Sequence, residues 1–227
     1  MGSALKMKLN SKDQLCAGMT RTEVLVVIGV VIVLVLVALP LLATFKRKMA
    51  KVDCIDNLRA LECATLAWAQ DHDNKYAMEL SSTNGGVREF VLSGSVVEFF
   101  TMLSNDIPSL RTPPEKALVC PTDRARTVAK SFDPRNENIS YFINADFSRD
   151  NPATVLMGDR NLMTNGAAVG PGRASLTANT VFGWTAEMHQ HRGILSYADG
   201  SEQEVAEDSL QSISKISGLA TNRLAVP

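Results

Sequence analysis

The sequence predicts an α+β protein in which one long N-terminal helix precedes a globular head. Uncharged apolar residues fill positions 24–43, and apolar residues recur at helical spacing through 51–71. Short strand-like segments separated by turns then follow from residue 75 to residue 227. A chain of 227 residues has room for one ordinary domain with an appendage, or for two small domains.

The formal net charge of −1 conceals two parts of opposite sign. Residues 1–51 carry a net charge of +6, whereas residues 52–227 carry a net charge of −7. Nucleic-acid-binding proteins usually present a basic domain or stripe, so we expect no nucleic-acid partner for this acidic bulk. The concentration of apolar residues near the start also excludes a purely cytosolic, uniformly globular enzyme.

The apolar block at 24–43 predicts a membrane-spanning helix over residues 19–45. Twenty residues at about 1.5 Å each cover roughly 30 Å, the thickness of the hydrocarbon layer of a bilayer. A buried helix of a soluble protein rarely runs this long without a polar residue. A cleaved secretory signal has a shorter apolar region and a small-x-small cleavage site, whereas this block ends in Pro40 and a basic cluster at 46–48. Four basic residues lie on each side of the block, so the positive-inside rule does not choose an orientation.

The residues directly before the block carry a recognisable motif. A polar segment, 1–18, ends at Gly18 and is followed by Met19, Thr20 and, three residues later, Glu23. This arrangement resembles the class III signal of type IV pilins and type II secretion pseudopilins. The resemblance implies that prepilin peptidase cleaves the 1–18 leader after Gly18 on the cytoplasmic side and N-methylates Met19. It also implies a single-pass inner-membrane protein whose head lies outside the cytoplasm.

Glu23 is the charged residue at the start of the predicted span. A carboxylate at the edge of a lipid-embedded helix costs on the order of a few kcal/mol unless it is paired, and such residues are usually functional. The α-amine that cleavage creates on Met19 of a neighbouring copy can neutralise it. We therefore expect Glu23, with Thr20 of the same motif, to act in assembly of a helical fibre. The alternative is an interfacial Glu23 that lies among lipid head groups.

The helix is expected to continue beyond the membrane as a stem over residues 46–73. Pro40 removes a backbone donor and clashes with the preceding turn, so it predicts a bend within the span. The stem is amphipathic, and its apolar stripe should pack against the head. That stripe consists of Cys54, Leu58, Leu61, Thr65, Trp68 and His72.

Three of the four cysteines remain after removal of the leader, which contains Cys16. Cys54 and Cys63 are nine residues apart, so in a helix they face opposite sides about 13 Å apart and cannot bridge. Cys54 belongs to the head-facing stripe. If the head lies outside the cytoplasm, the expected disulfide joins Cys54 to Cys120 and ties the stem to the head. Two buried free thiols are the alternative.

The head, residues 74–227, is expected to be α+β. Strands are predicted over 139–145 and 154–158, and residues 117–119 are strand-like. A hairpin is predicted from 193–198 and 201–205 because Asp199-Gly200 is a strong turn signal between them. Helices are expected over 96–104 and 206–217, a loop over 165–172, and a loose tail after residue 217.

Four stretches of the chain extend the resemblance: residues 54–58, 119–123, 158–161 and 191–200. They are similar to pilin-like families abundant in planctomycetes and verrucomicrobia. The resemblance implies a long helix packed on a small antiparallel-sheet head. It further implies a structural subunit of a type II secretion pseudopilus or type IV pilus-like fibre. The partners would be other copies or related pilins, an inner-membrane platform and a separate assembly ATPase, since this chain has no nucleotide-binding loop.

A membrane-anchored hydrolase or a metal-binding head domain is the alternative function. His189 and His191 with Asp199, Asp159 and Asp123 could form a metal site, because side chains at i and i+2 of an extended segment face the same way. Turn chemistry alone accounts for Asp199, and no G-x-S-x-G or H-E-x-x-H motif occurs. We therefore expect no enzyme and assign no catalytic residue, cofactor or metal ligand. A structural calcium site built from head carboxylates remains open.

Overall fold

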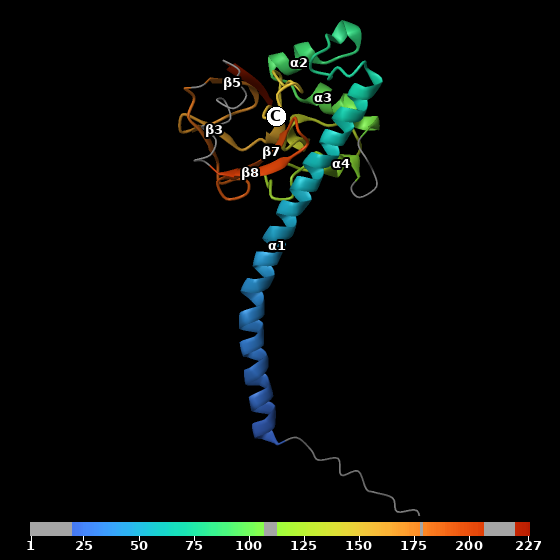
Figure 1. Ribbon diagram of the computed structural model, residues 1–227. Coiled ribbons are helices and arrows are strands. Elements are labelled where there is room, and N and C mark those ends of the chain that lie inside the picture. Colours follow the sequence, from blue (N-terminus) through green and yellow to red (C-terminus); the bar gives the residue numbers. More distant parts are fainter. Residues whose placement is uncertain (1–19, 107–112, 178, 207–220) are drawn as a thin grey trace, which may run out of the picture. The chain divides into compact units, whose positions relative to one another are not determined.

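The computed structural model describes residues 20–106, 113–177, 179–206 and 221–227. The chain divides into two units, Met1–Phe45 and Lys46–Pro227. Helix α1, Arg21–Asp71, contributes its first part to one unit and its second part to the other (Figure 1). The predicted cleavage residues Gly18 and Met19 lie outside the described residues, as does Cys16.

The first unit consists, in the described residues, mainly of the apolar part of α1. Every large apolar side chain from Val24 to Leu42 is exposed, with exposed fractions of 41–67%. By length and composition this helix is long and apolar enough to cross a membrane, and an exposed apolar surface of this size needs lipid or protein to cover it. The helix continues through Pro40, whose carbonyl accepts a hydrogen bond from Thr44 Oγ1 at 3.0 Å. The predicted bend at Pro40 stays a prediction.

The described part of the head contains two antiparallel sheets. A six-stranded sheet has the order β5-β9-β1-β2-β7-β8, and a three-stranded sheet has the order β4-β3-β6. The strands of the larger sheet are β1 (Tyr141–Asn144), β2 (Val155–Asp159), β5 (Gly172–Thr177), β7 (Arg192–Tyr197), β8 (Glu202–Ala206) and β9 (Thr221–Val226). Those of the smaller sheet are β3 (Leu162–Thr164), β4 (Ala167–Ala168) and β6 (Phe182–Trp184).

Short helices complete the described part of the head. The α-helices are α2 (Arg88–Ser93), α3 (Val97–Met102) and α4 (Pro114–Ala117). The 3-10 helices are η1 (Ser82–Asn84), η2 (Leu103–Asn105) and η3 (Asn136–Asn138). The chain is therefore α+β, with a long apolar N-terminal helix and an antiparallel-sheet head, as the sequence predicts.

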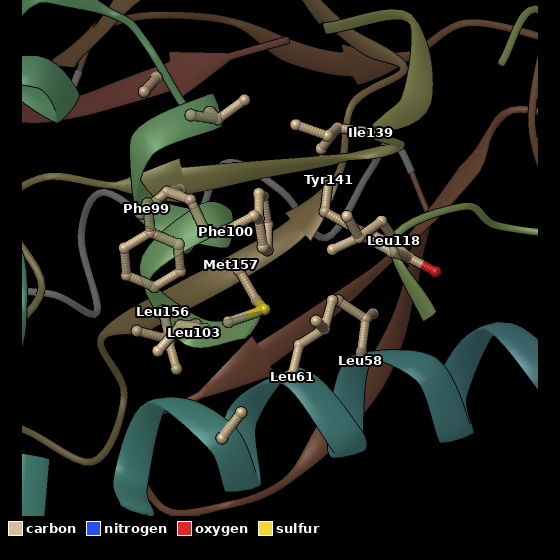
Figure 2. Close-up of a cluster of buried hydrophobic side chains, with 14 of the residues drawn as sticks. Leu58, Leu61, Phe99, Phe100, Leu103, Leu118, Ile139, Tyr141, Leu156 and Met157 are labelled. Atoms are coloured by element: carbon tan, nitrogen blue, oxygen red, sulfur yellow. The ribbon is translucent and has the colours of Figure 1, made fainter. Parts of the chain in front are cut away.

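The main core lies between one face of the larger sheet and the helices. The predicted stripe on α1 is confirmed, because its members from Cys54 to Trp68 are buried. Figure 2 shows Leu58 and Leu61 of α1 pointing toward Met157 of β2, with side chains of α3 on the other side of this cluster. His72 lies one residue beyond the end of α1 and stacks on Trp68, with ring centroids 3.7 Å apart.

A second core lies on the opposite face of the larger sheet. There the buried side chains of Phe142 and Leu195 belong to one apolar cluster with Leu162 and Trp184 of the smaller sheet. All four residues of β1 and all five of β2 are buried, because these strands are covered on both faces. This double coverage explains why both strands are almost continuously apolar rather than alternating.

Polar contacts attach α1 to the β7–β8 hairpin. The Arg59 guanidinium donates to both carboxylate oxygens of Glu202, at 3.1 and 2.6 Å. About two helical turns before Arg59, the Lys51 ammonium lies 2.6 Å from the Glu204 carboxylate. Both acidic residues are on β8, so the hairpin is held along the stem.

Most of the predicted elements of the head are present. The strands expected over 139–145 and 154–158 correspond to β1 and β2, and the expected hairpin corresponds to β7 and β8. The helix expected over 96–104 corresponds to α3 followed by η2. Each signal was local, consisting of apolar runs of suitable length or an Asp-Gly turn.

Other expectations require correction. The tail is not loose, because β9 pairs with both β1 and β5, and its Leu224, Ala225 and Val226 are buried. The strand-like stretch 117–119 instead begins at the end of α4, where Pro113 precedes a single helical turn. The expected loop at 165–172 contains β4 and the start of β5. Ala206 ends β8, and the rest of the expected helix 206–217 lies outside the described residues.

Candidate functional site

The start of α1 is organised by Thr20 and Glu23. The Thr20 backbone N–H and hydroxyl both donate to Glu23 Oε2, at 2.8 and 2.9 Å. The Glu23 backbone N–H donates in turn to Thr20 Oγ1 at 3.3 Å. This reciprocal arrangement is a capping box, which satisfies backbone donors left free at a helix start. Sequence reasoning missed this role, although Thr-x-x-Glu directly before an apolar run is its signature.

A second candidate site is a buried cluster in the head, which we call the Cys–Asp–His cluster. It consists of Cys54 on α1, Cys120 shortly after α4, Asp159 at the end of β2, and His189 shortly before β7. The potential ligand atoms of these four side chains all lie within 4.8 Å of one another. Both cysteines and Asp159 are fully buried, and the His189 side chain is 3% exposed. Four segments that are distant in sequence therefore meet at one buried point.

Short contacts connect the members of the cluster. Cys54 Sγ donates to Asp159 Oδ1 at 3.5 Å, and Cys120 Sγ lies 3.3 Å from His189 Nε2. The same imidazole nitrogen is 3.4 Å from Asp159 Oδ2. Tyr141 Oη lies 3.5 Å from Cys54 Sγ on another side of the cluster. The four side chains thus form an open ring of polar contacts that runs from Cys120 through His189 and Asp159 to Cys54.

Sheet register positions Asp159 in this ring. Tyr141 of β1 pairs directly with Asp159 of β2, which places both side chains on the α1 side of the sheet. The backbone N–H of Ile194 on β7 donates to Asp159 Oδ2 at 2.8 Å and orients the carboxyl group. The carboxyl is therefore held by one neighbouring strand and faces Cys54 on the helix.

Arg160, the residue after Asp159, stabilises the turn that carries Cys120. Arg160 donates to both oxygens of Asp123, at 2.7 and 2.8 Å. Asp123 also accepts from Ser140 Oγ at 2.9 Å, and its own backbone N–H donates to the Cys120 carbonyl at 2.9 Å. The Asp123 side chain is fully buried and the Arg160 side chain is 12% exposed. This bidentate pair therefore joins the end of β2 to the Cys120 turn.

The next residue, Asn161, holds the loop that carries His189. Its amide nitrogen donates to the backbone carbonyls of Thr185, Met188 and Arg192, at 3.0, 3.3 and 3.1 Å. Within this loop, residues 189–191 have consecutive positive φ angles of 46°, 55° and 61°. Non-glycine residues rarely adopt this left-handed region, and runs of them need support from their surroundings. Asn161 supplies part of that support.

Burial governs the ionisation of the cluster. Burial raises the pKa of Asp159 to about 8, and the charge of the nearby Cys120 adds to the rise. Burial also opposes ionisation of Cys120. The neighbouring Cys54 thiol and the His189 imidazole, together with the charge of His189, outweigh this effect and lower the pKa of Cys120 to about 5. Burial raises the pKa of Cys54 well above its ordinary value. Burial opposes protonation of His189, but its contacts with Cys120 and Asp159 outweigh burial and raise its pKa, so a protonated His189 beside a Cys120 thiolate is favoured.

A cleft of about 400 Å³ reaches the cluster from one side. His189 and Thr122 contribute to its wall, and Thr122 Oγ1 lies 3.1 Å from Cys120 Sγ and 3.3 Å from His189 Nε2. The remainder of the wall is mostly charged and includes Arg47, Lys48, Lys51, Arg124, Glu187 and Glu204. The cluster is therefore buried but lies next to a polar path to solvent.

The metal site considered from sequence had two histidines and three aspartates, and the structure brings only two of these residues together. Asp159 and His189 meet, whereas Asp123 is engaged by Arg160. His191 Nδ1 lies 3.1 Å from the Trp184 carbonyl, and Asp199 accepts from the Ser201 backbone N–H at 2.9 Å in the hairpin turn. The two cysteines complete the site in place of these residues. Sequence reasoning missed this combination because the four residues are far apart in the chain and have no metal-ligand spacing.

The predicted disulfide partners are neighbours. Cys54 and Cys120 are free thiols in this structure, and their sulfurs lie within 4.8 Å of each other. Cys63 is exposed on another face of α1, as its helical spacing from Cys54 predicts. The disulfide between Cys54 and Cys120 stays a prediction, as does its alternative of two buried free thiols.

Comparisons of this chain with models of protein families, with curated proteins and with solved structures found no match. Function is therefore inferred from the residues and the geometry described above.

Proposed function

We propose that this chain is a pilin-like structural subunit of a type II secretion pseudopilus or a type IV pilus-like fibre. The observation that carries the proposal is that the two parts of α1 differ in the exposure of their apolar side chains. Its first part exposes apolar side chains along the whole stretch from Val24 to Leu42, and its second part buries a stripe in the core of an antiparallel-sheet head. Such a helix can pass from a membrane into the centre of a fibre while the head stays folded around its other end.

In this proposal the chain is a single-pass inner-membrane protein with its head outside the cytoplasm. Prepilin peptidase removes the leader between Gly18 and Met19 and methylates the new amine. Glu23 then exchanges its hydrogen bonds with Thr20 for the amine of an adjacent copy. A membrane platform and a separate ATPase drive assembly, and the chain itself catalyses no reaction.

Substitution of Glu23 tests the pairing of charges. Glutamine can keep the hydrogen bonds of a capping box but carries no charge, whereas alanine removes both. We expect Glu23→Gln and Glu23→Ala to insert into the membrane normally and to be lost from fibres. Membrane fractionation and quantification in purified fibres measure the two steps. Normal incorporation of Glu23→Gln would show that capping, not charge, is the role of this residue.

Processing is tested by intact-mass analysis of the native protein from cells with and without the peptidase. The expected species begins at Met19 and carries one added methyl group when the peptidase is present, and begins at Met1 when it is absent. A chain that begins at Met1 in both strains would refute the proposed processing and the assembly that depends on it.

A further inference from the structure

We propose that Cys54, Cys120, Asp159 and His189 bind one divalent transition-metal ion, with zinc as the best fit. The four residues supply two sulfurs, one nitrogen and one carboxylate oxygen, all within 4.8 Å of one another. Thiolate and imidazole ligands favour zinc over magnesium or calcium, which prefer oxygen alone. This site is independent of the pilin proposal, since it depends only on the head and the stem.

The spacing of the ligand atoms matches a tetrahedral centre. Zinc bonds of about 2.0–2.3 Å place neighbouring ligands of a tetrahedron roughly 3.3–3.8 Å apart. Three contacts between the four side chains have this length: Cys120 Sγ to His189 Nε2 at 3.3 Å, His189 Nε2 to Asp159 Oδ2 at 3.4 Å, and Cys54 Sγ to the other carboxyl oxygen, Asp159 Oδ1, at 3.5 Å. All four ligand atoms also lie within 4.8 Å of one another, so a movement of about 1 Å or less per atom brings them to tetrahedral spacing.

The surroundings of the ligands support an ion as well. The Ile194 backbone N–H orients the Asp159 carboxyl, and the hydroxyls of Tyr141 and Thr122 lie near the two sulfurs. Polar groups that orient ligands in this way are usual around protein metal sites. The strained conformation of His189, with φ of 46°, directs its imidazole into the cluster. Backbone strain of this kind is concentrated at functional sites.

The ligand set indicates a structural centre rather than a catalytic one. Four protein ligands fill a tetrahedral zinc ion and leave no open position for a substrate. The ligands come from α1, the turn after α4, the end of β2 and the loop before β7. A single ion would thus cross-link the stem to three parts of the head. A disulfide between Cys54 and Cys120 would use both sulfur ligands, so the two states exclude each other.

The test begins with the full chain purified in detergent from membranes, without chelator. We expect about one zinc per chain by elemental analysis, and free thiols at Cys54 and Cys120 after denaturation and alkylation. Stripping with a chelator should lower the thermal stability of the wild-type chain, and added zinc should restore it. Cobalt(II) added in place of zinc should give the visible absorption of a tetrahedral site with thiolate ligands.

Single substitutions identify the ligands. Cys54→Ser, Cys120→Ser, Asp159→Asn and His189→Gln should reduce bound zinc to background. Cys63→Ser and His191→Gln are matched controls, since Cys63 is exposed and His191 bonds the Trp184 carbonyl, and both should retain zinc. If a ligand variant does not fold, the cobalt spectrum and the chelator effect on the wild type still decide the question. A metal-free wild-type chain, whether its cysteines are bridged or free, would overturn the proposal, as would full zinc retention by Cys54→Ser.

Discussion

At the scale of single residues, the negative charge of Glu62 on α1 is destabilising because its carboxyl is partly buried. Its carboxyl is partly buried and accepts a hydrogen bond from Ser196 Oγ at 2.8 Å. Burial raises the pKa of Glu62, and the charges of Glu202 and Asp199 add to the rise, while the Ser196 hydrogen bond and Arg59 oppose it. The folded chain therefore binds a proton at Glu62 more tightly than the unfolded chain does.

We predict that Glu62→Gln raises the melting temperature at a pH of about 7 and has little effect at a pH of about 4. A raised folded-state pKa favours folding below the ordinary pKa of 4.5, and this contribution is lost as pH rises through the folded-state value. Glutamine keeps an acceptor for Ser196 and avoids the buried charge. Thermal melts at the two pH values provide the measurement, and a lower melting temperature of the variant at neutral pH would contradict the explanation.

At the scale of elements, the end of β2 organises the whole buried cluster. Three consecutive residues each make a different contact. Asp159 is a member of the cluster, Arg160 forms an ion pair with Asp123 in the Cys120 turn, and Asn161 donates hydrogen bonds to backbone carbonyls of the His189 loop. Strand β2 is hydrogen-bonded to β1 on one side and to β7 on the other, so the backbone that carries these three side chains is held in place. Loops that carry Cys120 and His189 are thus positioned by the sheet rather than by their own structure.

The Arg160–Asp123 pair should therefore be important for stability. Asp123→Asn removes one partner of a buried pair, and we expect a loss of about 3 kcal/mol in the free energy of unfolding. Arg192→Gln removes a pair whose two side chains, Arg192 and Glu204, are 54% and 20% exposed, and Glu204 keeps Lys51 as a partner, so it should cost less than about 1 kcal/mol. Chemical denaturation of the two variants gives the comparison. Equal losses would mean that the Arg160–Asp123 pair has no special role.

At the scale of the whole molecule, exposed apolar surface is concentrated in one unit. Among the described residues, the large apolar side chains of the first unit are all exposed, whereas the exposed ones in Lys46–Pro227 are scattered: Met49, Val52, Phe90, Val128 and Val181. Scattered apolar residues are normal on soluble surfaces, but a continuous apolar helix is not. The second unit also keeps the buried stripe of α1 within it.

We predict that a fragment of residues 46–227 folds and stays soluble without detergent, while the full chain requires it. All members of both hydrophobic cores lie in this fragment, so deletion of residues 1–45 removes no core contact. Size-exclusion chromatography and circular dichroism measure the outcome. An unfolded or aggregated fragment would show that the first unit contributes to folding of the head.

The sequence by itself determined the elements whose signals are local. The apolar block, the stripe from Cys54 to Trp68 and the Asp199-Gly200 hairpin depend on periodicity or turn chemistry within a few residues, and all three are present. The capping box at Thr20 and Glu23 was equally local and could have been predicted.

Only the tertiary structure decided the rest. The last strand, β9, takes its place between β5 and β1 because of pairing with strands far away in sequence. The meeting of Cys54, Cys120, Asp159 and His189 depends on sheet register, on the docking of α1 and on two loops held by Arg160 and Asn161. Such contacts leave no periodic pattern along the chain, since each ligand comes from a different element and its position is set by packing between elements.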